Sequence, residues 1–482
     1  MKANDSFTAK PWRIGPIPFA DRQAFRSLAL LIWLLLAGIP ARLLAADPPE
    51  FGASLCLVAK FSQGQPERQI PMMSELGVGW VREHVAWEQF EPRPGQYAGL
   101  APGLLRQLAF YREHDIGLVA LLSLRNPVAY PGAGGGDSVQ SYDPEAFGRF
   151  ALAAAQALER EGVRFVLEIG NEPHNSSLLP LLGGNWNAAP PSPWVAHYVR
   201  MANAAVAAVK GWNPAVKLLA QDDMWIIQYR FLDAGLSPEI DGLSVHPYVN
   251  GIPERAAVAH DTDWTRPYQL VDRSRAFLSA VRRLRAHALL RLGRVPEIWI
   301  TEWGWPVQTR PPAFSATEVA QYLPRAFLLA AEAGIAANCW FSSQDSVDGP
   351  MGLTTNQGGR RPAYDAYRTL AAQLGQLKFE SRVFGSADNV EGLHGFRLVN
   401  ADGAARIVIW NAGTEPWKLD LAGAGTAVGF DGAVLQPVRG ADGHACLALD
   451  AGPVYLAGDW SRAGAVVASR GRPGCAPAEA AQ

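Results

Sequence analysis

The segment Arg164-Phe-Val-Leu-Glu-Ile-Gly-Asn-Glu-Pro173 decides the fold of this chain, together with a second segment, Pro296-Glu-Ile-Trp-Ile-Thr-Glu-Trp-Gly304. In each segment a short run of β-forming apolar residues ends at a glutamate, Glu172 in the first and Glu302 in the second. Each run is therefore predicted to be a strand that delivers a carboxylate to the point where the strand stops. Two carboxylates that face each other across a sugar are the groups that glycoside hydrolysis requires.

The chain from residue 47 to residue 375 alternates short apolar strands with helical stretches such as Pro144–Glu161. This rhythm predicts the α/β class and, with eight strands, a (β/α)₈ barrel, in which functional residues lie at the C-terminal ends of the strands. Both glutamates obey that rule. The expected strands are roughly Phe51–Val58, Gly79–His84, Gly117–Leu122, Phe165–Gly170, Val216–Gln221, Gly242–His246, Ile298–Glu302 and Asn338–Phe341.

Beyond the barrel, residues 376–465 show short apolar runs separated by Gly, Asp and Asn turns, which predicts a small antiparallel β-sandwich. The expected strands there are Gly392–Val399, Arg406–Trp410, Trp417–Leu421, Ala445–Leu449 and Val454–Ala457. Because the region shows no cluster of exposed aromatic residues, we expect a brace for the barrel; the alternative is a glycan-binding module. Residues 466–482 are predicted to be a disordered tail.

Residues 1–46 carry the features of an export signal. Basic residues precede the apolar stretch Ser27–Ala41, and the small residues Ala45 and Ala46 resemble a cleavage site. The apolar stretch is short for a membrane-spanning helix, which favours a signal peptide, with an uncleaved inner-membrane anchor as the alternative. Either way we expect the protein to be exported, to the periplasm or out of the cell.

The composition indicates a globular protein whose partner is not nucleic acid. The 482 residues are 49% apolar and 18% charged, and the formal net charge is -2. No metal-ligand spacing is present, and the Gly-rich stretch 131–136 lacks the Lys-Ser/Thr of a phosphate-binding loop, so neither a metal nor a cofactor is expected. The 16 tryptophans suit either a large core or sugar stacking. We expect a monomer.

The four cysteines do not form a disulfide framework on spacing alone. Cys56 and Cys339 fall in the predicted first and eighth strands, where disulfide geometry is rare, so we expect buried free thiols. Cys446 and Cys475 both follow the barrel and could pair in an oxidising compartment, which the sequence leaves open.

Asn-Glu-Pro after the fourth strand and an apolar strand ending in Glu at the seventh resemble the motifs of clan A retaining glycoside hydrolases. The resemblance implies that Glu172 is the acid/base and Glu302 the nucleophile, with carboxyl groups about 5–5.5 Å apart. It also implies that Asn171 binds the sugar 2-hydroxyl and that Arg82 keeps the nucleophile ionised. Glu168 is the glutamate most easily mistaken for the acid/base, but alternation can point its side chain into the lower barrel, away from the substrate.

Further residues match the clan pattern around the same site. His246 and Tyr248 after the sixth strand are both candidates to bond the nucleophile, and the sequence does not choose between them. His84 alternates with Arg82 to the same face and could reach the substrate, while Trp340 resembles the tryptophan that floors the catalytic sugar site. Loop aromatics that follow strand ends could line further sugar subsites: Trp87, Tyr130, Trp186, Trp194, Trp225, Trp303 and Trp305.

Within the clan, the segments from Trp80 to Tyr97 and from Phe341 to Tyr367 resemble glycoside hydrolase family 39 and the periplasmic Psl-type exopolysaccharide glycosidases. The resemblance implies hydrolysis of a polysaccharide or oligosaccharide, and we expect endo-cleavage of a bacterial exopolysaccharide. One alternative is an activity like that of a β-xylosidase or β-glucanase on plant glycans. Another, of a different class, is a carbohydrate-binding barrel without catalysis.

Overall fold

A computed structural model describes residues 49–59, 66–131, 143–175, 191–223, 225–257, 265–439, 445–462 and 464–470. The predicted export segment, residues 1–46, lies outside these ranges, so the choice between a signal peptide and an anchor stays a prediction. None of the helices in the described ranges has both the length and the apolar character needed to cross a membrane.

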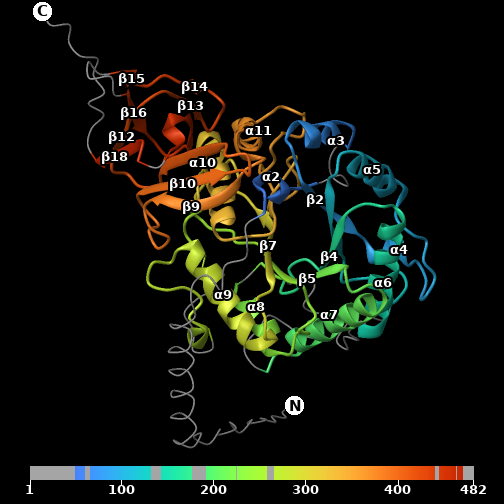
Figure 1. The fold of residues 1–482 in the computed structure, drawn as a ribbon. Helices are drawn as coiled ribbons and strands as arrows, with labels where there is room; N and C mark the ends of the chain where they lie inside the picture. The colour runs from blue at the N-terminus through green and yellow to red at the C-terminus, as the bar shows by residue number, and fades with distance from the viewer. Residues whose placement is uncertain are drawn as a thin grey trace, which may run out of the picture. The chain divides into compact units, whose positions relative to one another are not determined.

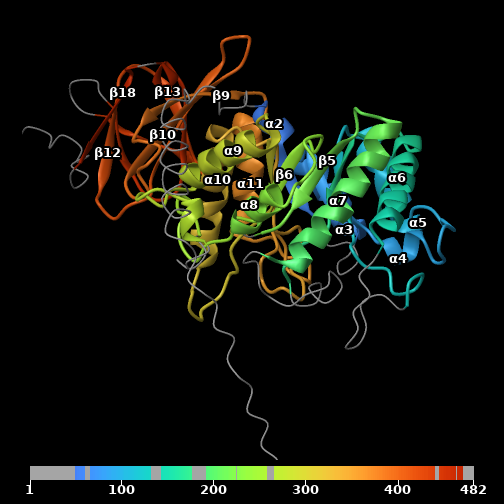
Figure 2. The same cartoon turned by 90° about the horizontal axis from the view of Figure 1, so that it is seen from below.

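Eight parallel strands close into a barrel in chain order, which confirms the predicted (β/α)₈ fold. The strands are β1 (Leu55–Val58), β2 (Trp80–Val85), β3 (Gly117–Leu122), β4 (Phe165–Ile169), β5 (Lys217–Gln221), β6 (Gly242–Val245), β7 (Glu297–Trp303) and β8 (Asn338–Trp340). The main helices around them are α3 (Pro66–Glu75), α5 (Pro102–Glu113), α6 (Pro144–Arg160), α7 (Pro193–Trp212), α8 (Trp225–Asp233), α9 (Phe277–Leu292), α10 (Ala316–Glu332) and α11 (Pro362–Leu374). Figure 1 and Figure 2 show these helices outside the strands.

Alternation along the strands separates an inner from an outer apolar layer. Residues such as Val58, Val119, Val166 and Leu219 form one buried cluster inside the barrel. The residues between them pack outward against the helices in a second, larger cluster. Polar side chains that point inward near the C-terminal ends of the strands therefore lie above this inner apolar cluster.

The first strand is shorter than the sequence indicates. Phe51–Ser54 forms the short helix α2, and only Leu55–Val58 pairs with β2 and β8. The Ser54 hydroxyl bonds the carbonyl of Phe51, a local bond that favours a helical turn over a strand. The sequence of residues 51–58 does not reveal this change of structure, because a short apolar run is compatible with either a strand or a helix.

The expectation of free thiols in the barrel wall is wrong. Cys56 and Cys339 are register partners on β1 and β8 and form a disulfide. The two strands are adjacent only because the barrel closes, so neighbouring inward side chains meet there although 283 residues separate them in sequence. The disulfide therefore links the first and last strands of the barrel covalently.

Replacing both cysteines, Cys56→Ala with Cys339→Ala, should lower the free energy of unfolding by about 2–4 kcal/mol, because the unfolded chain is no longer cross-linked. Urea unfolding followed by tryptophan fluorescence measures the change. The control starts from the Cys446→Ala/Cys475→Ala variant, which keeps only Cys56 and Cys339. A reductant should lower the free energy of unfolding of this variant to that of the variant with all four cysteines replaced. Equal stability with and without reductant would contradict a stabilising disulfide.

After the barrel the chain forms two antiparallel sheets, as predicted. One contains β9 (Lys378–Phe384), β10 (Leu393–Val399), β11 (Ala405–Asn411), β13 (Gly425–Gly429), β14 (Val434–Leu435) and β17 (Val454–Gly458); the other contains β12 (Trp417–Leu421), β15 (Val438–Arg439), β16 (Ala445–Leu449) and β18 (Val466–Arg470). The predicted tail therefore begins too early, because Val466–Arg470 pairs along the whole length of β12. Cys446 on β16 is disulfide-bonded; its suggested partner Cys475 lies outside the described residues.

A buried charged cluster joins the sandwich to the barrel, beside α10 (Figure 1). Glu254 accepts hydrogen bonds from Arg325 on α10 at 2.9 and 2.5 Å and from the Trp410 indole on β11 at 2.8 Å. Arg382 on β9 also pairs with Glu332 at the end of α10. A buried polar group without a hydrogen-bond partner destabilises the folded protein, so the sandwich must pack on the barrel in the orientation that forms these bonds. The arrangement suits the expected brace.

Candidate active site

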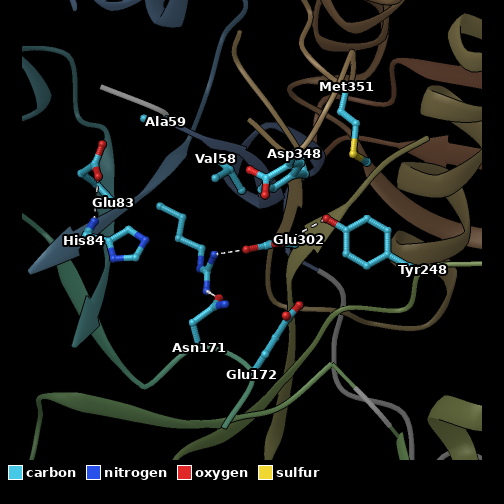
Figure 3. Close-up of a pocket in the computed structure, with 12 residues that line it drawn as sticks. Val58, Ala59, Glu83, His84, Asn171, Glu172, Tyr248, Glu302, Asp348 and Met351 are labelled. Carbon is cyan, nitrogen blue, oxygen red and sulfur yellow. Dashed lines mark hydrogen bonds and ion pairs between the residues drawn. The ribbon is translucent and has the colours of Figure 1, made fainter. Parts of the chain in front are cut away.

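A cavity of about 300 Å³ opens at the C-terminal ends of the barrel strands. Figure 3 shows Glu172 and Glu302 in it, with the Tyr248 hydroxyl directed at Glu302. The lining combines charged and polar side chains with apolar and aromatic ones. The lining residues are Val58, Ala59, Arg82, Glu83, His84, Asn171, Glu172, Tyr248, Glu302, Phe341, Asp348 and Met351.

A bulge in β7 turns Glu302 into the cavity. Ile300 pairs with Asn338 and Trp303 with Trp340, so β7 has one residue more than β8 over this stretch. Such a bulge resets the alternation of side chains. As a result Thr301 bonds His246 inside the barrel and Glu302 also lines the cavity.

The acid/base candidate is also placed by an irregular backbone. Gly170, with φ of +78°, ends β4, and Glu172 itself has φ of +46°. Alternation alone would put Glu168, Gly170 and Glu172 on one face and Asn171 on the other, but both Asn171 and Glu172 line the cavity. A left-handed conformation is unfavourable for glutamate and needs support from its surroundings.

Arg82 on β2 organises three acceptors. Its guanidinium donates to Glu302 at 2.5 Å, to Glu168 at 2.6 Å and to the Asn171 side-chain oxygen at 2.7 Å. Burial lowers the pKa of Arg82, but the charges of Glu168 and Glu302 raise it by more. The pKa therefore lies above its ordinary value and the side chain stays a cation. Glu168 is fully buried, does not line the cavity, and also accepts a hydrogen bond from the Ser244 hydroxyl at 2.6 Å, as expected for a side chain that points into the lower barrel.

The structure separates the roles of the two candidates after β6. The Tyr248 hydroxyl donates to Glu302 at 3.0 Å, whereas His246 Nδ1 lies 3.0 Å from Glu172 and 3.7 Å from Glu302. Burial lowers the pKa of His246, but the charge of Glu302 and the hydrogen bond to Glu172 outweigh it, and the pKa lies above its ordinary value. Tyr248 thus contacts the candidate nucleophile and His246 the candidate acid/base.

The two carboxylates lie at the short separation expected from the sequence. One oxygen of Glu172, one oxygen of Glu302 and a ring nitrogen of His246 all lie within 4.8 Å of one another. A carboxyl pair about 5–5.5 Å apart suits a covalent glycosyl intermediate, whereas inversion needs about 6.5–9.5 Å to hold a water molecule.

His174, two residues after Glu172, is held by an acidic pair at the end of β5. Its Nδ1 lies 3.1 Å from Asp222 and 3.0 Å from Asp223. Burial lowers the pKa of His174, but the charge of Asp222 and the bonds to both aspartates raise it to about 11. The imidazolium therefore anchors the segment that follows the acid/base candidate.

His174→Gln should lower the free energy of unfolding by about 1.5–3 kcal/mol near pH 6, because a charged hydrogen bond is lost. The pKa of His174 is higher in the folded protein than its ordinary 6.5, so the stabilisation is complete below pH 6.5 and fades as the pH rises toward 11. Urea unfolding at pH 6 and pH 10 should show a smaller difference at pH 10. The exposed His114 provides a control, since His114→Gln should change little at either pH. A difference that grows with pH would contradict this assignment.

Two groups within the described ranges bring donor atoms together as a metal site would: Glu172–His246–Glu302 and His174–Asp222–Asp223. In the first, Arg82 and Tyr248 already occupy the Glu302 oxygens. In the second, both aspartates contact the protonated Nδ1 of His174, which a metal would have to displace. Neither arrangement favours a metal over the hydrogen bonds that are present.

Two of the predicted substrate contacts lie elsewhere. Trp340 is 1% exposed and Trp303 is 0% exposed, and both belong to the outer layer, next to Trp305. The β7 bulge explains the position of Trp303, because it turns the Glu302 side chain into the barrel and the following Trp303 side chain outward. Phe341, one residue after Trp340, belongs to the inner cluster and lines the cavity, so it occupies the place expected for Trp340.

Most of the loop aromatics also serve the core. Trp87, Trp194, Trp225 and Trp305 are buried, and Tyr130 packs on Trp87 and bonds Glu91. Trp186 lies outside the described residues. His84, in contrast, is exposed and lines the cavity, where a substrate can reach it.

Several site residues were missed by the sequence reasoning: Gln221, Ser244, Thr301, Phe341, Asp348 and Met351. Gln221 had a signal, because a polar Gln-Asp-Asp sequence ends the apolar strand β5. Asp348 and Met351 had none, since the loop after β8 shows no periodic pattern. Their place in the cavity depends on how that loop folds back.

The fold and the site together define a (β/α)₈-barrel protein with a carboxylate pair at the upper strand ends. No protein-family model matches the chain, and no curated protein matches it in sequence.

Solved structures do resemble the chain. A family 39 glycoside hydrolase from the gut symbiont Bacteroides cellulosilyticus WH2 is 19% identical, with a TM-score of 0.65 over 86% of this chain and 82% of that one. A GH30 endoxylanase from Clostridium papyrosolvens C71 is 12% identical, with a TM-score of 0.54 over 86% and 97%. A GH51 arabinofuranosidase from Xanthomonas axonopodis pv. citri is 13% identical, with a TM-score of 0.51 over 85% and 97%. At these identities the likeness shows a shared fold.

Proposed function

We propose that this protein is a retaining glycoside hydrolase with Glu302 as nucleophile and Glu172 as acid/base. The observation that carries the proposal is the pair of carboxylates with oxygens within 4.8 Å across an open cavity. Glu302 pairs with Arg82, whose side chain stays a cation, whereas Glu172 contacts His246, so Glu302 is placed to act as the anion. The fold shared with three glycoside hydrolases supports the same conclusion.

In the first step, an oxygen of Glu302 attacks the anomeric carbon and the bond to the leaving oxygen breaks. Glu172 gives its proton to that oxygen, so the leaving group departs as a neutral alcohol. Arg82 and Tyr248 hold the Glu302 carboxylate by one bond to each oxygen, which fixes its plane for the attack. The product is a glycosyl ester on Glu302.

In the second step, water attacks the anomeric carbon and Glu172, now a carboxylate, takes its proton. The ester bond breaks and Glu302 is released with the sugar in its original configuration. Asn171 is held by Arg82 through its oxygen at 2.7 Å, which leaves its amide nitrogen to donate to a sugar hydroxyl. No metal or cofactor is needed for either step.

For the substrate we propose a bacterial exopolysaccharide, which the enzyme cuts within the polysaccharide chain as the polysaccharide crosses the periplasm. The support is the resemblance of the sequence to family 39 and to the Psl-type enzymes, together with the export features of residues 1–46. The cavity suits a sugar, because its lining combines the apolar side chains of Phe341 and Met351 and the Tyr248 ring with several polar groups.

The test is release of reducing ends from the exopolysaccharide of the source organism, with xylan and β-glucan as plant substrates. Release from the exopolysaccharide, in fragments of several sugars, is the expected result. Release from the plant polymers alone would replace the proposed substrate but keep the reaction. Binding of the polysaccharides without release from any of them would favour a carbohydrate-binding barrel.

A further inference from the structure

Gln221, the last residue of β5, is fully buried and touches both the backbone and the side-chain partner of Glu172. Its side-chain oxygen accepts the backbone N–H of Glu172 at 2.6 Å. Its side-chain nitrogen lies 3.1 Å from His246 Nε2. His246 Nδ1 in turn lies 3.0 Å from Glu172 Oε1.

The orientation of the Gln221 amide follows from chemistry. A backbone N–H can only donate, so the Gln221 atom beside Glu172 N must be the oxygen. The NH₂ group therefore faces His246, and it too can only donate. His246 Nε2 must accept that bond, which selects the neutral tautomer that carries its hydrogen on Nδ1.

The protonated form of His246 leads to the same contact with Glu172. An imidazolium would point its Nε2 hydrogen at Thr301 Oγ1, 3.0 Å away, and would still carry a hydrogen on Nδ1. Only the neutral tautomer with hydrogen on Nε2 lacks the Nδ1 hydrogen, and it sets the Gln221 NH₂ against another N–H without the attraction of a positive charge to Glu172. In the other neutral tautomer and in the imidazolium, Nδ1 donates to Glu172 Oε1.

We infer that Gln221 is a positioning residue that, through His246, keeps the acid proton of Glu172 on Oε2. Glu172 Oε1 accepts a hydrogen bond from His246 Nδ1, so it cannot at the same time point a proton of its own at Nδ1. Oε2 has no hydrogen-bond partner within the described part of the chain, and Glu172 lines the cavity. The proton therefore faces the leaving oxygen. This inference rests on the proposed function for its catalytic meaning.

Gln221 has a second task in the same arrangement. Glu172 adopts φ of +46°, and the bond from its N–H to Gln221 holds that backbone in place. The Gln221 backbone is itself fixed, because its N–H donates to the Tyr198 hydroxyl at 2.9 Å, which donates to the Ile169 carbonyl at 2.8 Å. The end of β5 thus positions both the backbone and the proton of the acid/base.

Gln221→Glu separates the two tasks. A carboxylate still accepts the N–H of Glu172, but it now offers an acceptor to His246 Nε2. His246 then either takes the tautomer with a bare Nδ1, which moves the acid proton to Oε1, or stays positively charged beside Glu172. Both outcomes impair proton donation to the leaving group while the backbone bond survives.

The activity test compares aryl glycosides with leaving groups that do or do not need protonation: 2,4-dinitrophenyl and phenyl β-D-glucosides, with the matching mannosides and xylosides. We expect Gln221→Glu to lower kcat/KM for the phenyl glycoside by about 10²–10³-fold and for the dinitrophenyl glycoside by less than about tenfold. Gln107→Glu, at a buried glutamine on α5 that does not line the cavity, makes the same change away from Glu172 and should not alter the ratio. An equal fall on both substrates in Gln221→Glu would overturn the inference.

A spectroscopic test is independent of turnover. In protein labelled with ¹⁵N-histidine, the His246 signals, assigned by their loss in His246→Asn, should show a protonated Nδ1. A bare Nδ1 in the wild-type protein would overturn the inference even if hydrolysis is observed. If neither the exopolysaccharide nor any of the aryl glycosides is hydrolysed but Nδ1 is protonated, the proposed function fails and the placement of the proton by Gln221 stands.

Discussion

Glu302→Gln should abolish hydrolysis, with a fall in kcat on the order of 10⁴-fold or more, while the fold is retained. An amide cannot form the glycosyl ester, so the first step has no nucleophile. Glutamine keeps the shape of the side chain, and its oxygen can still accept from Arg82 or Tyr248. Release of reducing ends per enzyme molecule measures the fall.

The matched control for this change is Glu318→Gln, which replaces a surface glutamate in the capping box of α10, away from the cavity. It should turn over substrate as the wild type does. Binding of the polysaccharide by Glu302→Gln should persist, because the cavity keeps its other lining residues. Turnover within tenfold of wild type in Glu302→Gln would mean that a different group attacks the sugar.

Arg82→Met should lower the free energy of unfolding by about 3–5 kcal/mol and also remove activity. The change leaves Glu168 buried without the cation at 2.6 Å that balances it, and an uncompensated buried charge is strongly destabilising. Glu302 loses its 2.5 Å bond in the same step. Urea unfolding at pH 7 measures the first effect and reducing-end release the second.

A second substitution tests the electrostatic cause. Glu168→Gln in the Arg82→Met background removes the unbalanced charge but keeps an oxygen for the Ser244 hydroxyl. The double variant should therefore recover part of the lost stability, without recovering activity. If the double variant is no more stable than Arg82→Met, lost packing rather than lost charge balance explains the defect.

The barrel could be predicted from the sequence because its signal is repeated. Eight apolar runs alternate with helical stretches, and several strand bounds agree to within a residue, such as β3 at Gly117–Leu122. Closure of the barrel makes β1 and β8 neighbours, and the sequence predicts this, but it does not give the register of the two strands. The disulfide was missed because disulfide geometry is rare between strands, whereas Cys56 and Cys339 are register partners here. The strand β18 was missed because the end of the chain is rich in Ala, Gly and Arg, and this composition hid the short run Val466–Arg470 that pairs with β12.

Within the site, the sequence predicted which strand ends supply Arg82, Glu172 and Glu302, but not the irregular backbone that orients the two glutamates. Arg82 and Glu168 follow the alternation of regular strands and meet inside the barrel. Trp303 was assigned to the cavity because the β7 bulge leaves no mark in the sequence. Trp340 was assigned there by the resemblance to the clan, whereas the next residue, Phe341, is the one that lines the cavity. The role of Gln221 depends on hydrogen bonds to two other strands, which no local pattern encodes.

The most direct test of the central claim is to trap the covalent intermediate. The protein would be incubated with 2,4-dinitrophenyl 2-deoxy-2-fluoro-β-glycosides of glucose, mannose and xylose, digested, and analysed by mass spectrometry. The account predicts a fluoroglycosyl ester on Glu302, in the peptide that contains Ile300 to Gly304. A product of inverted configuration, or a label on any residue other than Glu302, would contradict it.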